Sequence, residues 1–258
     1  MTRAAGLDVT VREADVGPVQ IQGPKSKDVM VALFGDDVLE VPYYFLRRYE
    51  LDGMQVLVSR TGYTAELGYE IYVFEAGRYG ERLWDLVLEA GRPHGLSVIG
   101  PSHIRRIEGG ILAYGADMWL DTNPYEVGMG YDWMVDLEQK DEFIGKQALA
   151  RIKQEGVKRK LAGVEIAGAS LGAYNDGSMI DVFPVSRRGD RVGQVTSACH
   201  SPRLGKNIGY AMVPIELADL GTELDVEIEG DRRDAVVVAM PFIDPKKEIP
   251  KQRLVTEH

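Results

Sequence analysis

The sequence predicts a multidomain α+β protein whose C-terminal part is a small β-barrel or sandwich. In the first part, strand-like runs precede amphipathic helical patterns without strict alternation, which favours α+β over a parallel α/β sheet. After about residue 158, short β-rich runs are separated by Gly, Asp and Pro, as in barrels and sandwiches. We therefore expect an α+β region at 1–155, a β domain at 156–243, and a polar tail at 244–258 that frays.

The first elements follow from local pattern. Residues 17–23 alternate apolar and polar side chains, which predicts a short strand, and residues 24–35 predict a helix that begins near a proline and ends at a glycine. Two strands are expected at 43–51 and 54–60. Asp52-Gly53 lies between them, and such a pair suits the positive φ angles of a type I′ hairpin turn.

A further strand at 68–74 precedes an amphipathic helix that ends near Gly91. Shorter helices are expected at 102–112 and 146–154. In the first of these, three isoleucines recur at helical spacing and predict a core face, while Arg105, Arg106 and Glu108 are expected to form ordinary ion pairs on other faces. Asn123 is placed to cap a turn or short helix.

Composition restricts the possible functions. The chain has 258 residues, 45% of them hydrophobic, and a formal net charge of -10, so it repels nucleic acids and anionic membranes. The single cysteine, Cys199, allows no intrachain disulfide and suits a reducing compartment. Because the N-terminus carries no apolar signal core and no stretch is long enough to span a bilayer, we expect a cytoplasmic protein.

Several familiar catalytic motifs are missing from the sequence. It contains no GxGxxG dinucleotide loop and no phosphate-binding GxxxxGK[ST] loop. The four histidines are scattered and, with one cysteine, give no spacing typical of a metal site. Cys199 and His200 are neighbours on an expected strand, so their side chains point to opposite faces and make a poor nucleophile–base pair.

One carboxylate stands out in the first half. On the strand expected at 68–74, Glu70 and Tyr72 share one face, whereas Tyr69, Ile71 and Val73 share the other. Glu70 could simply face solvent or pair with an arginine. Alternatively, a carboxylate in an aromatic pocket would accept two N–H bonds from a planar ring such as a pterin or purine.

The segments SRTGYTAELGYEI, IRRIEGGILAYGADM, NPYEVGMG with DEFIGKQAL, GQVTSACHSPRLGKNIGYAMVP and the closing PF resemble successive blocks of the glycine-cleavage T-protein (aminomethyltransferase) family. The blocks occur in family order over nearly the whole chain. The resemblance implies a folate-binding multidomain fold with a C-terminal β-barrel and tetrahydrofolate as cofactor. It places Glu70 on the pterin ring, Tyr63 and Tyr43 in the pocket lining, and Tyr131 where members carry a tryptophan near the folate, a position that Trp133 takes if the register slips.

Two departures from the family pattern bear on function. Ser102 stands where glycine-cleavage members have a folate-contacting arginine, and the PSHIRRIEGG segment looks closer to the dimethylsulfoniopropionate demethylase branch. The resemblance also begins about a third of the way into the family pattern. The earlier part normally supplies the catalytic aspartate, which Asp8 and Asp15 do not replace by position, so the catalytic residues are unknown and the activity of this chain alone is in question.

The resemblance implies transfer of a one-carbon unit from a small donor to N5 of tetrahydrofolate, by an aminomethyltransferase or a demethylase. An aminomethyl donor would make a lipoyl carrier protein a partner, and another chain could supply the early part of the pattern. The alternatives are a non-catalytic folate-binding module and one part of a split enzyme. No metal, nucleic acid or membrane is expected as a partner.

Overall fold

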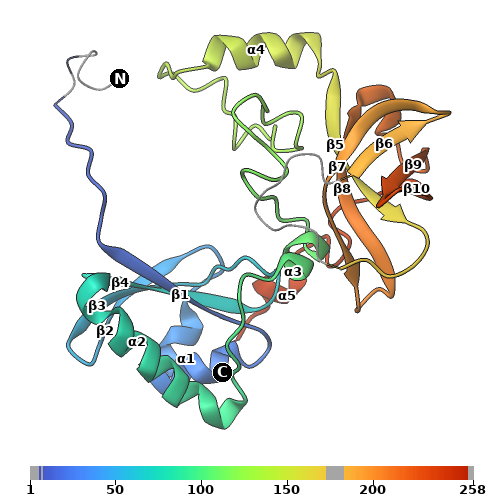
Figure 1. The fold of residues 1–258 in the computed structure, drawn as a ribbon. Helices are drawn as coiled ribbons and strands as arrows, with labels where there is room; N and C mark the ends of the chain where they lie inside the picture. Colours follow the sequence, from blue (N-terminus) through green and yellow to red (C-terminus); the bar gives the residue numbers. More distant parts are fainter. Residues whose placement is uncertain (1–5, 7, 173–182, 255–258) are drawn as a thin grey trace. The chain divides into compact units, whose positions relative to one another are not determined.

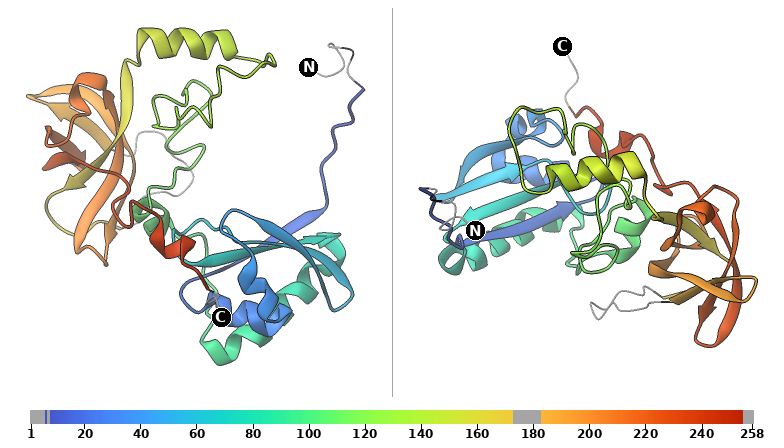
Figure 2. Two further views of the ribbon diagram at one scale, coloured as in Figure 1. Left: turned by 180° about the vertical axis from the view of Figure 1, so that it is seen from behind. Right: turned by 90° about the horizontal axis from the view of Figure 1, so that it is seen from above.

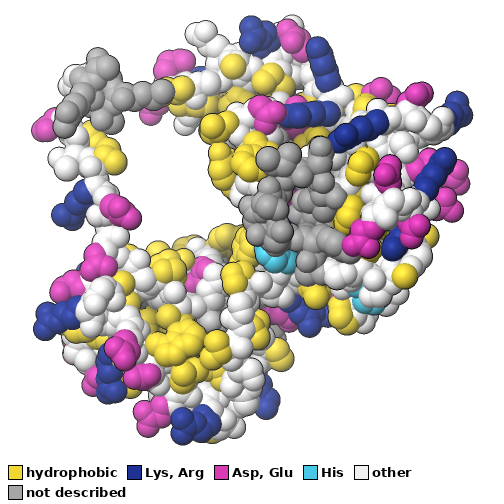
Figure 3. All heavy atoms as spheres, viewed as in Figure 1, with side chains coloured by type: hydrophobic (Ala, Val, Ile, Leu, Met, Phe, Trp, Pro, Cys, Tyr) yellow, Lys and Arg dark blue, Asp and Glu magenta, His cyan; other side chains and the backbone are white. Residues whose placement is uncertain are grey.

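The chain folds as two compact units in the computed structural model, which describes residue 6, residues 8–172 and residues 183–254. The first unit comprises residues 1–62, 66–99 and 248–258, and the second comprises residues 63–65 and 100–247. Each is described by itself below. Among the described residues, no helix is long and apolar enough to cross a membrane. Acidic and basic side chains are interspersed on the face that Figure 3 shows.

The first unit is built on a four-stranded antiparallel sheet with the strand order β1-β4-β3-β2. The sheet packs against α1 and α2 through the hydrophobic core of this unit (Figure 1). The prediction of an α+β unit, in which strands and amphipathic helices do not strictly alternate, is therefore confirmed here. The strands are β1 (Val16–Gln22), β2 (Leu46–Leu51), β3 (Met54–Ser59) and β4 (Gly68–Phe74), and the helices are α1 (Ser26–Phe34), α2 (Ala76–Gly91), the 3-10 turns η1 (Asp36–Glu40) and η2 (Arg92–His94), and α5 (Glu248–Lys251).

Strand alternation decides which side chains of the sheet meet the helices. Tyr69, Ile71 and Val73 of β4 are buried in the core with Val56 and Val58 of β3. Glu70 and Tyr72 consequently point to the opposite face, as the period of two predicts. The sheet thus has an apolar face under the helices and a polar face that carries Glu70.

The β2–β3 hairpin forms where the sequence predicts it. Asp52 has φ 51° and Gly53 has φ 76°, both in the left-handed region that a type I′ turn requires. β2 starts at Leu46, three residues later than expected, because Tyr44 also has a positive φ (67°) and interrupts the extended backbone. The turn fixes the pairing of Leu51 with Met54 and hence the register of the whole hairpin.

The second unit contains a closed six-stranded antiparallel barrel with the order β10-β5-β8-β7-β6-β9 (Figure 2). Its interior is filled by aliphatic side chains such as Val164, Val185, Val195 and Val226, each 0% exposed. The barrel alternative, rather than the sandwich, is therefore confirmed. The elements are α3 (His103–Glu108), α4 (Lys146–Glu155), β5 (Arg159–Ile166), β6 (Phe183–Arg187), β7 (Asp190–Ser201), β8 (Lys206–Pro214), η3 (Ile215–Leu217), β9 (Glu223–Ile228) and β10 (Asp231–Val238).

Two expectations about element ends are wrong. The helix expected to reach Leu112 ends at Glu108, because Gly109 and Gly110 follow and Gly110 has φ 69°, which no helix continues. The expected fraying of the tail is wrong for residues 248–254, since α5 lies there and is bonded to Arg60; the last four residues lie outside the described residues. The first strand of the barrel, β5, starts at Arg159.

Candidate functional site

Glu70 is held on the polar face of the sheet by two hydroxyl donors. Its Oε2 accepts a very short hydrogen bond from Thr61 Oγ1 and a second bond, of 3.1 Å, from the Tyr72 hydroxyl. Thr61 is in turn 2.9 Å from Ser59 Oγ. Burial and the neighbouring Glu70 carboxylate raise the pKa of Tyr72, so that this hydroxyl stays protonated and remains a donor.

The second carboxylate oxygen of Glu70, Oε1, accepts no hydrogen bond from the part of the chain that the structure describes. No arginine or lysine among the described residues pairs with Glu70 either, so the ion-pair alternative for this residue is wrong. An ionised carboxylate is an acceptor with about four lone-pair sites. Glu70 is therefore oriented by the protein and still has an oxygen available for a ligand.

The neighbours of Glu70 follow from the strand register. Gln20 of β1 and Ser59 of β3 lie opposite Glu70, and Leu46 of β2 lies opposite Ser59. Gln22, next on the same face of β1, donates to the carbonyl oxygens of Thr61 and Tyr69 at 3.2 and 3.3 Å. These side-chain bonds tie the loop after β3, which carries Thr61, to β1 and β4.

Tyr43 lies in the same unit as Glu70 but in a different environment. It lines a cavity of about 430 Å³ together with Arg60, and its ring meets that of Tyr44 edge-on at 4.4 Å between centroids. Arg60 follows Ser59 on the extended chain, so its side chain points away from the face that carries Ser59 and Glu70. The structure thus places Tyr43 beside Arg60 rather than beside Glu70.

Tyr63 belongs to the second unit. Its hydroxyl donates a 3.0 Å hydrogen bond to the carbonyl oxygen of Leu112, in the chain that follows α3. Burial raises the pKa of this hydroxyl, partly offset by the Arg106 guanidinium. The bond fixes one edge of the tyrosine ring to the loop after α3, which leaves the ring half-buried and able to line a pocket.

Beneath Tyr63 lies a buried polar network centred on Arg106. Arg106 and Asp117 form a 2.8 Å ion pair in which both side chains are 0% exposed. Asp117 also accepts 2.6 and 2.8 Å bonds from the Ser197 and Thr196 hydroxyls of β7, and His103 Nδ1 accepts from Arg106 Nε at 3.3 Å. The network joins α3 to the barrel and holds the segment that Tyr63 binds.

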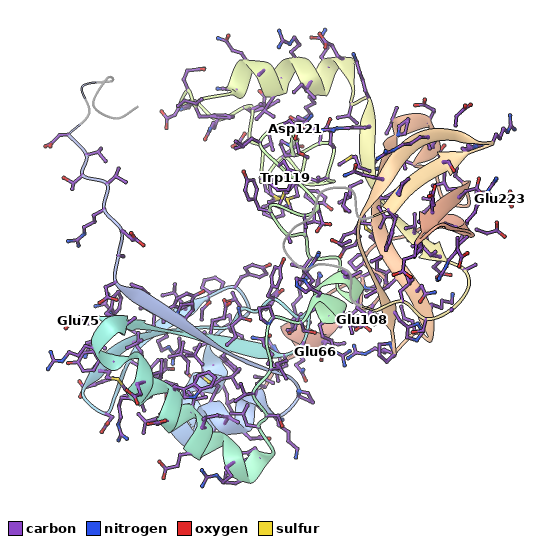
Figure 4. The ribbon with its side chains drawn as sticks, in the orientation of Figure 1. Glu66, Glu75, Glu108, Trp119, Asp121 and Glu223 are labelled. Carbon is purple, nitrogen blue, oxygen red and sulfur yellow. The ribbon has the colours of Figure 1, made fainter. Side chains whose placement is uncertain are left out.

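The sequence did not reveal this network. Helical spacing places Arg105 and Arg106 outside the isoleucine face and predicts ordinary ion pairs for both. Arg105 forms such a pair, with its guanidinium 2.9 Å from Glu108. Arg106, by contrast, faces the barrel, because β7 and β8 cover that side of α3. Glu108 is also buried at 2% exposure and accepts a 2.6 Å bond from Ser201 (Figure 4).

Tyr131 and Trp133 are both exposed, at 58% and 79%. Their rings stack with centroids 5.8 Å apart and an interplanar angle of 11°. Stacking makes the pair a single aromatic surface, so either ring could take the position near the folate that the resemblance assigns to Tyr131. A second aromatic pair, Tyr114 and Trp119, lies earlier in the same segment with centroids 6.3 Å apart (Figure 4).

Two other side chains of the second unit, those of Ser102 and Cys199, contribute to its structure. Ser102 caps α3 by accepting a hydrogen bond from the backbone N–H of Arg105 at 3.3 Å, in keeping with the preference for serine at this position. Cys199 is 0% exposed, and burial with the nearby Glu108 raises its pKa to about 12. A buried thiol of this kind is not a nucleophile.

Comparisons with known proteins agree with this geometry. A family model described as the GCVT N-terminal domain matches residues 1–139, and one described as the glycine cleavage T-protein C-terminal barrel domain matches residues 159–244. The chain is 34% identical over 244 residues to an aminomethyltransferase of Desulfitobacterium hafniense, which covers 93% of this chain and 64% of that relative. It is also 34% identical over 234 residues to the dimethylsulfoniopropionate demethylase DmdA of Ruegeria pomeroyi, with coverage of 91% and 61%.

Among solved structures, the fold is similar to that of the glycine cleavage system aminomethyltransferase T from Bartonella henselae. The TM-score is 0.71 at 23% identity, with coverage of 88% of this chain and 60% of that one. The chain spans about 64% of the length of the first curated relative it matches. Both family models and the relatives above 30% identity agree, and the chain therefore belongs to the glycine cleavage T-protein family.

Proposed function

We propose that this chain binds tetrahydrofolate through Glu70 and serves in the transfer of a one-carbon unit from a small donor to that cofactor. The family to which it belongs is tetrahydrofolate-dependent. The observation that carries the proposal is the Glu70 carboxylate, which two hydroxyls orient on the polar face of the sheet while Oε1 accepts no bond from the described residues.

The residues present fit a pterin. A pterin ring offers adjacent N–H donors in one plane, and a carboxylate whose direction is already fixed can accept them without losing further side-chain freedom. The Thr61 and Tyr72 hydroxyls supply this preorganisation through Oε2. An unoriented glutamate on a solvated strand would have to be ordered at the moment of binding, at the expense of affinity.

The chain's own residues would then have separate roles. Glu70 accepts the N–H groups of the ring. The resemblance also assigns Tyr63, Tyr43 and Tyr131 to the pocket lining, but Tyr43 lies beside Arg60 and away from Glu70. Tetrahydrofolate, when bound, supplies N5 as the acceptor of the one-carbon unit. The catalytic contribution of these residues is positioning, which can supply a large part of a rate enhancement without a proton-handling group.

The donor is proposed to be a small molecule. Ser102 is engaged as the cap of α3, so at the position of the folate-contacting arginine of glycine-cleavage members this chain makes a helix cap instead. This supports a methyl donor, as in the demethylase branch, over an aminomethyl group delivered by a lipoyl carrier protein. For the latter donor, the carrier protein would be a partner, and a further chain could complete the site.

Calorimetric titration of the full chain with tetrahydrofolate under anaerobic conditions tests the proposal. Glu70→Gln keeps the shape of the side chain but replaces one acceptor oxygen with an NH₂ donor. Because hydrogen bonds to a charged group contribute about 1.5–3 kcal/mol each, we expect this variant to bind roughly 10- to 100-fold more weakly.

Glu50→Gln is the matched control. Glu50 lies at the far end of β2, on the same face of the sheet, and is exposed. Its substitution should leave the titration unchanged. If the folded wild-type chain does not bind tetrahydrofolate, or if Glu70→Gln binds as tightly as Glu50→Gln, the proposed role of Glu70 is wrong.

A further inference from the structure

Arg60 is a buried cation whose charge meets no carboxylate among the residues that the structure describes. Its side chain is 4% exposed. NH1 donates to the Val41 carbonyl oxygen at 3.5 Å, and NH2 donates to the carbonyl oxygens of Pro250, at 3.0 Å, and Gln252. These bonds connect the segment of α5 to the residue that follows β3. Carbonyl groups carry no net charge, so they do not balance the charge of the guanidinium.

Part of the donor capacity of Arg60 is also unused. Nε is buried and has no hydrogen-bond partner, and the hydroxyl of Tyr69, which is 0% exposed, has none either. Burial lowers the pKa of Arg60, and the nearby Tyr69 and Tyr43 partly offset this effect. Buried charges in proteins are normally paired, and unpaired buried donors are rare. The surroundings of Arg60 therefore lack an acceptor.

A cavity lies beside Arg60. It measures about 430 Å³ and is lined by Arg60, Lys251 and Arg253 with apolar side chains such as Leu39 and Leu254. This volume lies in the range of small-molecule pockets. Arg60 is the buried member of the three cationic residues that line the cavity.

One carboxylate among the residues that line the cavity would repel a bound anion. Glu40 also lines the cavity, but its Oε2 is 3.6 Å from Arg47 NH2 and its side chain is 61% exposed. A solvated and paired carboxylate at the rim contributes a weak, screened repulsion. Glu40 therefore does not neutralise Arg60, the buried cation at this cavity.

We propose that the cavity between Arg60, Tyr43 and Lys251 is a binding site for a small monocarboxylate with an apolar body. The carboxylate balances the Arg60 charge, and the apolar body packs against the aliphatic wall. A monocarboxylate fits better than a phosphate dianion, because Leu39, Val41, Pro42 and Leu254 can pack against an apolar body that phosphate lacks. The site is distinct from the Glu70 site, because Arg60 and Glu70 point to opposite faces of the sheet.

The test is a titration of the full chain with butyrate, followed through the ¹⁵N-bound side-chain protons of arginine by NMR. The Nε–H signal of Arg60 is expected to move and saturate at millimolar butyrate or below, and uncharged butyramide should give no saturable shift. Lys251→Ala removes an exposed cation from the rim and should weaken binding at least threefold at low salt.

Arg60→Lys should abolish the butyrate effect, and Arg48→Lys, an exposed arginine of β2 on the opposite face of the sheet, should leave it unchanged. If Arg60→Lys fails to fold, the titrations of the wild-type chain and of Lys251→Ala decide whether the cavity binds butyrate. No saturable shift in the wild-type chain, equal effects of butyrate and butyramide, or tighter binding of inorganic phosphate overturns the proposal. Glu70→Gln should bind butyrate normally, so a failure of the folate site leaves this test intact.

Discussion

At the scale of single residues, the Arg106–Asp117 pair is the feature on which the stability of the second unit should depend most. Asp117 receives the Arg106 guanidinium, two hydroxyls of β7 and the backbone N–H of Ala113. Asp117→Ala would leave a fully buried cation without a counter-ion. We expect the free energy of unfolding in urea to fall by about 3–5 kcal/mol.

The matched control for that substitution is Asp132→Ala. Asp132 is 2.8 Å from Lys153, but its side chain is 88% exposed. The loss of such a solvated pair should not shift the urea midpoint measurably. Equal destabilisation by the two substitutions would contradict the importance given to burial.

His103 adds a pH dependence at the same network. Burial, and then the Arg106 guanidinium, lower the pKa of His103 below 6.5. Because the unfolded chain takes up this proton more readily than the folded one, stability is full above about pH 6.5 and is lost as the pH falls from 6.5 to the lowered pKa. His103→Gln should flatten the dependence of urea midpoints on pH over that window, and NMR should place the His103 titration below 6.5.

Local patterns identified Glu70 and Tyr72 on one face of β4, because strand alternation is a property of the backbone alone. They could not identify Thr61 as the donor that orients Glu70, nor Asp117 and Ser197 as partners of Arg106. Those contacts join residues 9, 11 and 91 positions apart. Only the tertiary fold decides such pairings, and a single sequence carries no local signal for them.

At the scale of elements, the β2–β3 hairpin requires a glycine at its turn, whereas α2 contains a glycine that alanine could replace. Gly53 has φ 76°, where a side chain costs about 1–2 kcal/mol, so Gly53→Ala should lower the free energy of unfolding by roughly that amount. Gly80 lies inside α2, where an added Cβ would meet no atom within 4 Å. Gly80→Ala should instead stabilise the first unit by about 0.5–1 kcal/mol.

Thermal unfolding of both variants, followed by circular dichroism, gives the measurement, with melting temperatures expected to move in opposite directions. A higher melting temperature for Gly53→Ala would contradict the positive φ of the turn, and a lower one for Gly80→Ala would contradict the open environment of Gly80. Elements of this kind are the most predictable from sequence, since Asp-Gly turns and amphipathic periods are local. The end of α3 was predicted less well, because two glycines and barrel packing decide it together.

At the scale of the whole molecule, the two compact units are not two consecutive stretches of the sequence. The first unit takes its residues from three separate stretches, the last of which returns after the entire barrel has been completed. Sequence composition marks that last stretch as a polar tail. Its role depends on Arg60, whose NH2 donates to the carbonyl oxygens of Pro250 and Gln252, 190 and 192 residues later in the chain.

Truncation of the chain after Lys247 should therefore weaken the first unit and spare the barrel. Removal of α5 leaves Arg60 without two of its three acceptors, which we expect to cost about 1–3 kcal/mol from the unsatisfied donors alone. Hydrogen exchange resolves the two units in one experiment. Amides of core strand residues such as Ile71 and Val58 should exchange faster after truncation, whereas those of Val164 and Val226 in the barrel should keep their rates. Equal acceleration in both units would show that the last stretch stabilises the molecule as a whole and not through Arg60.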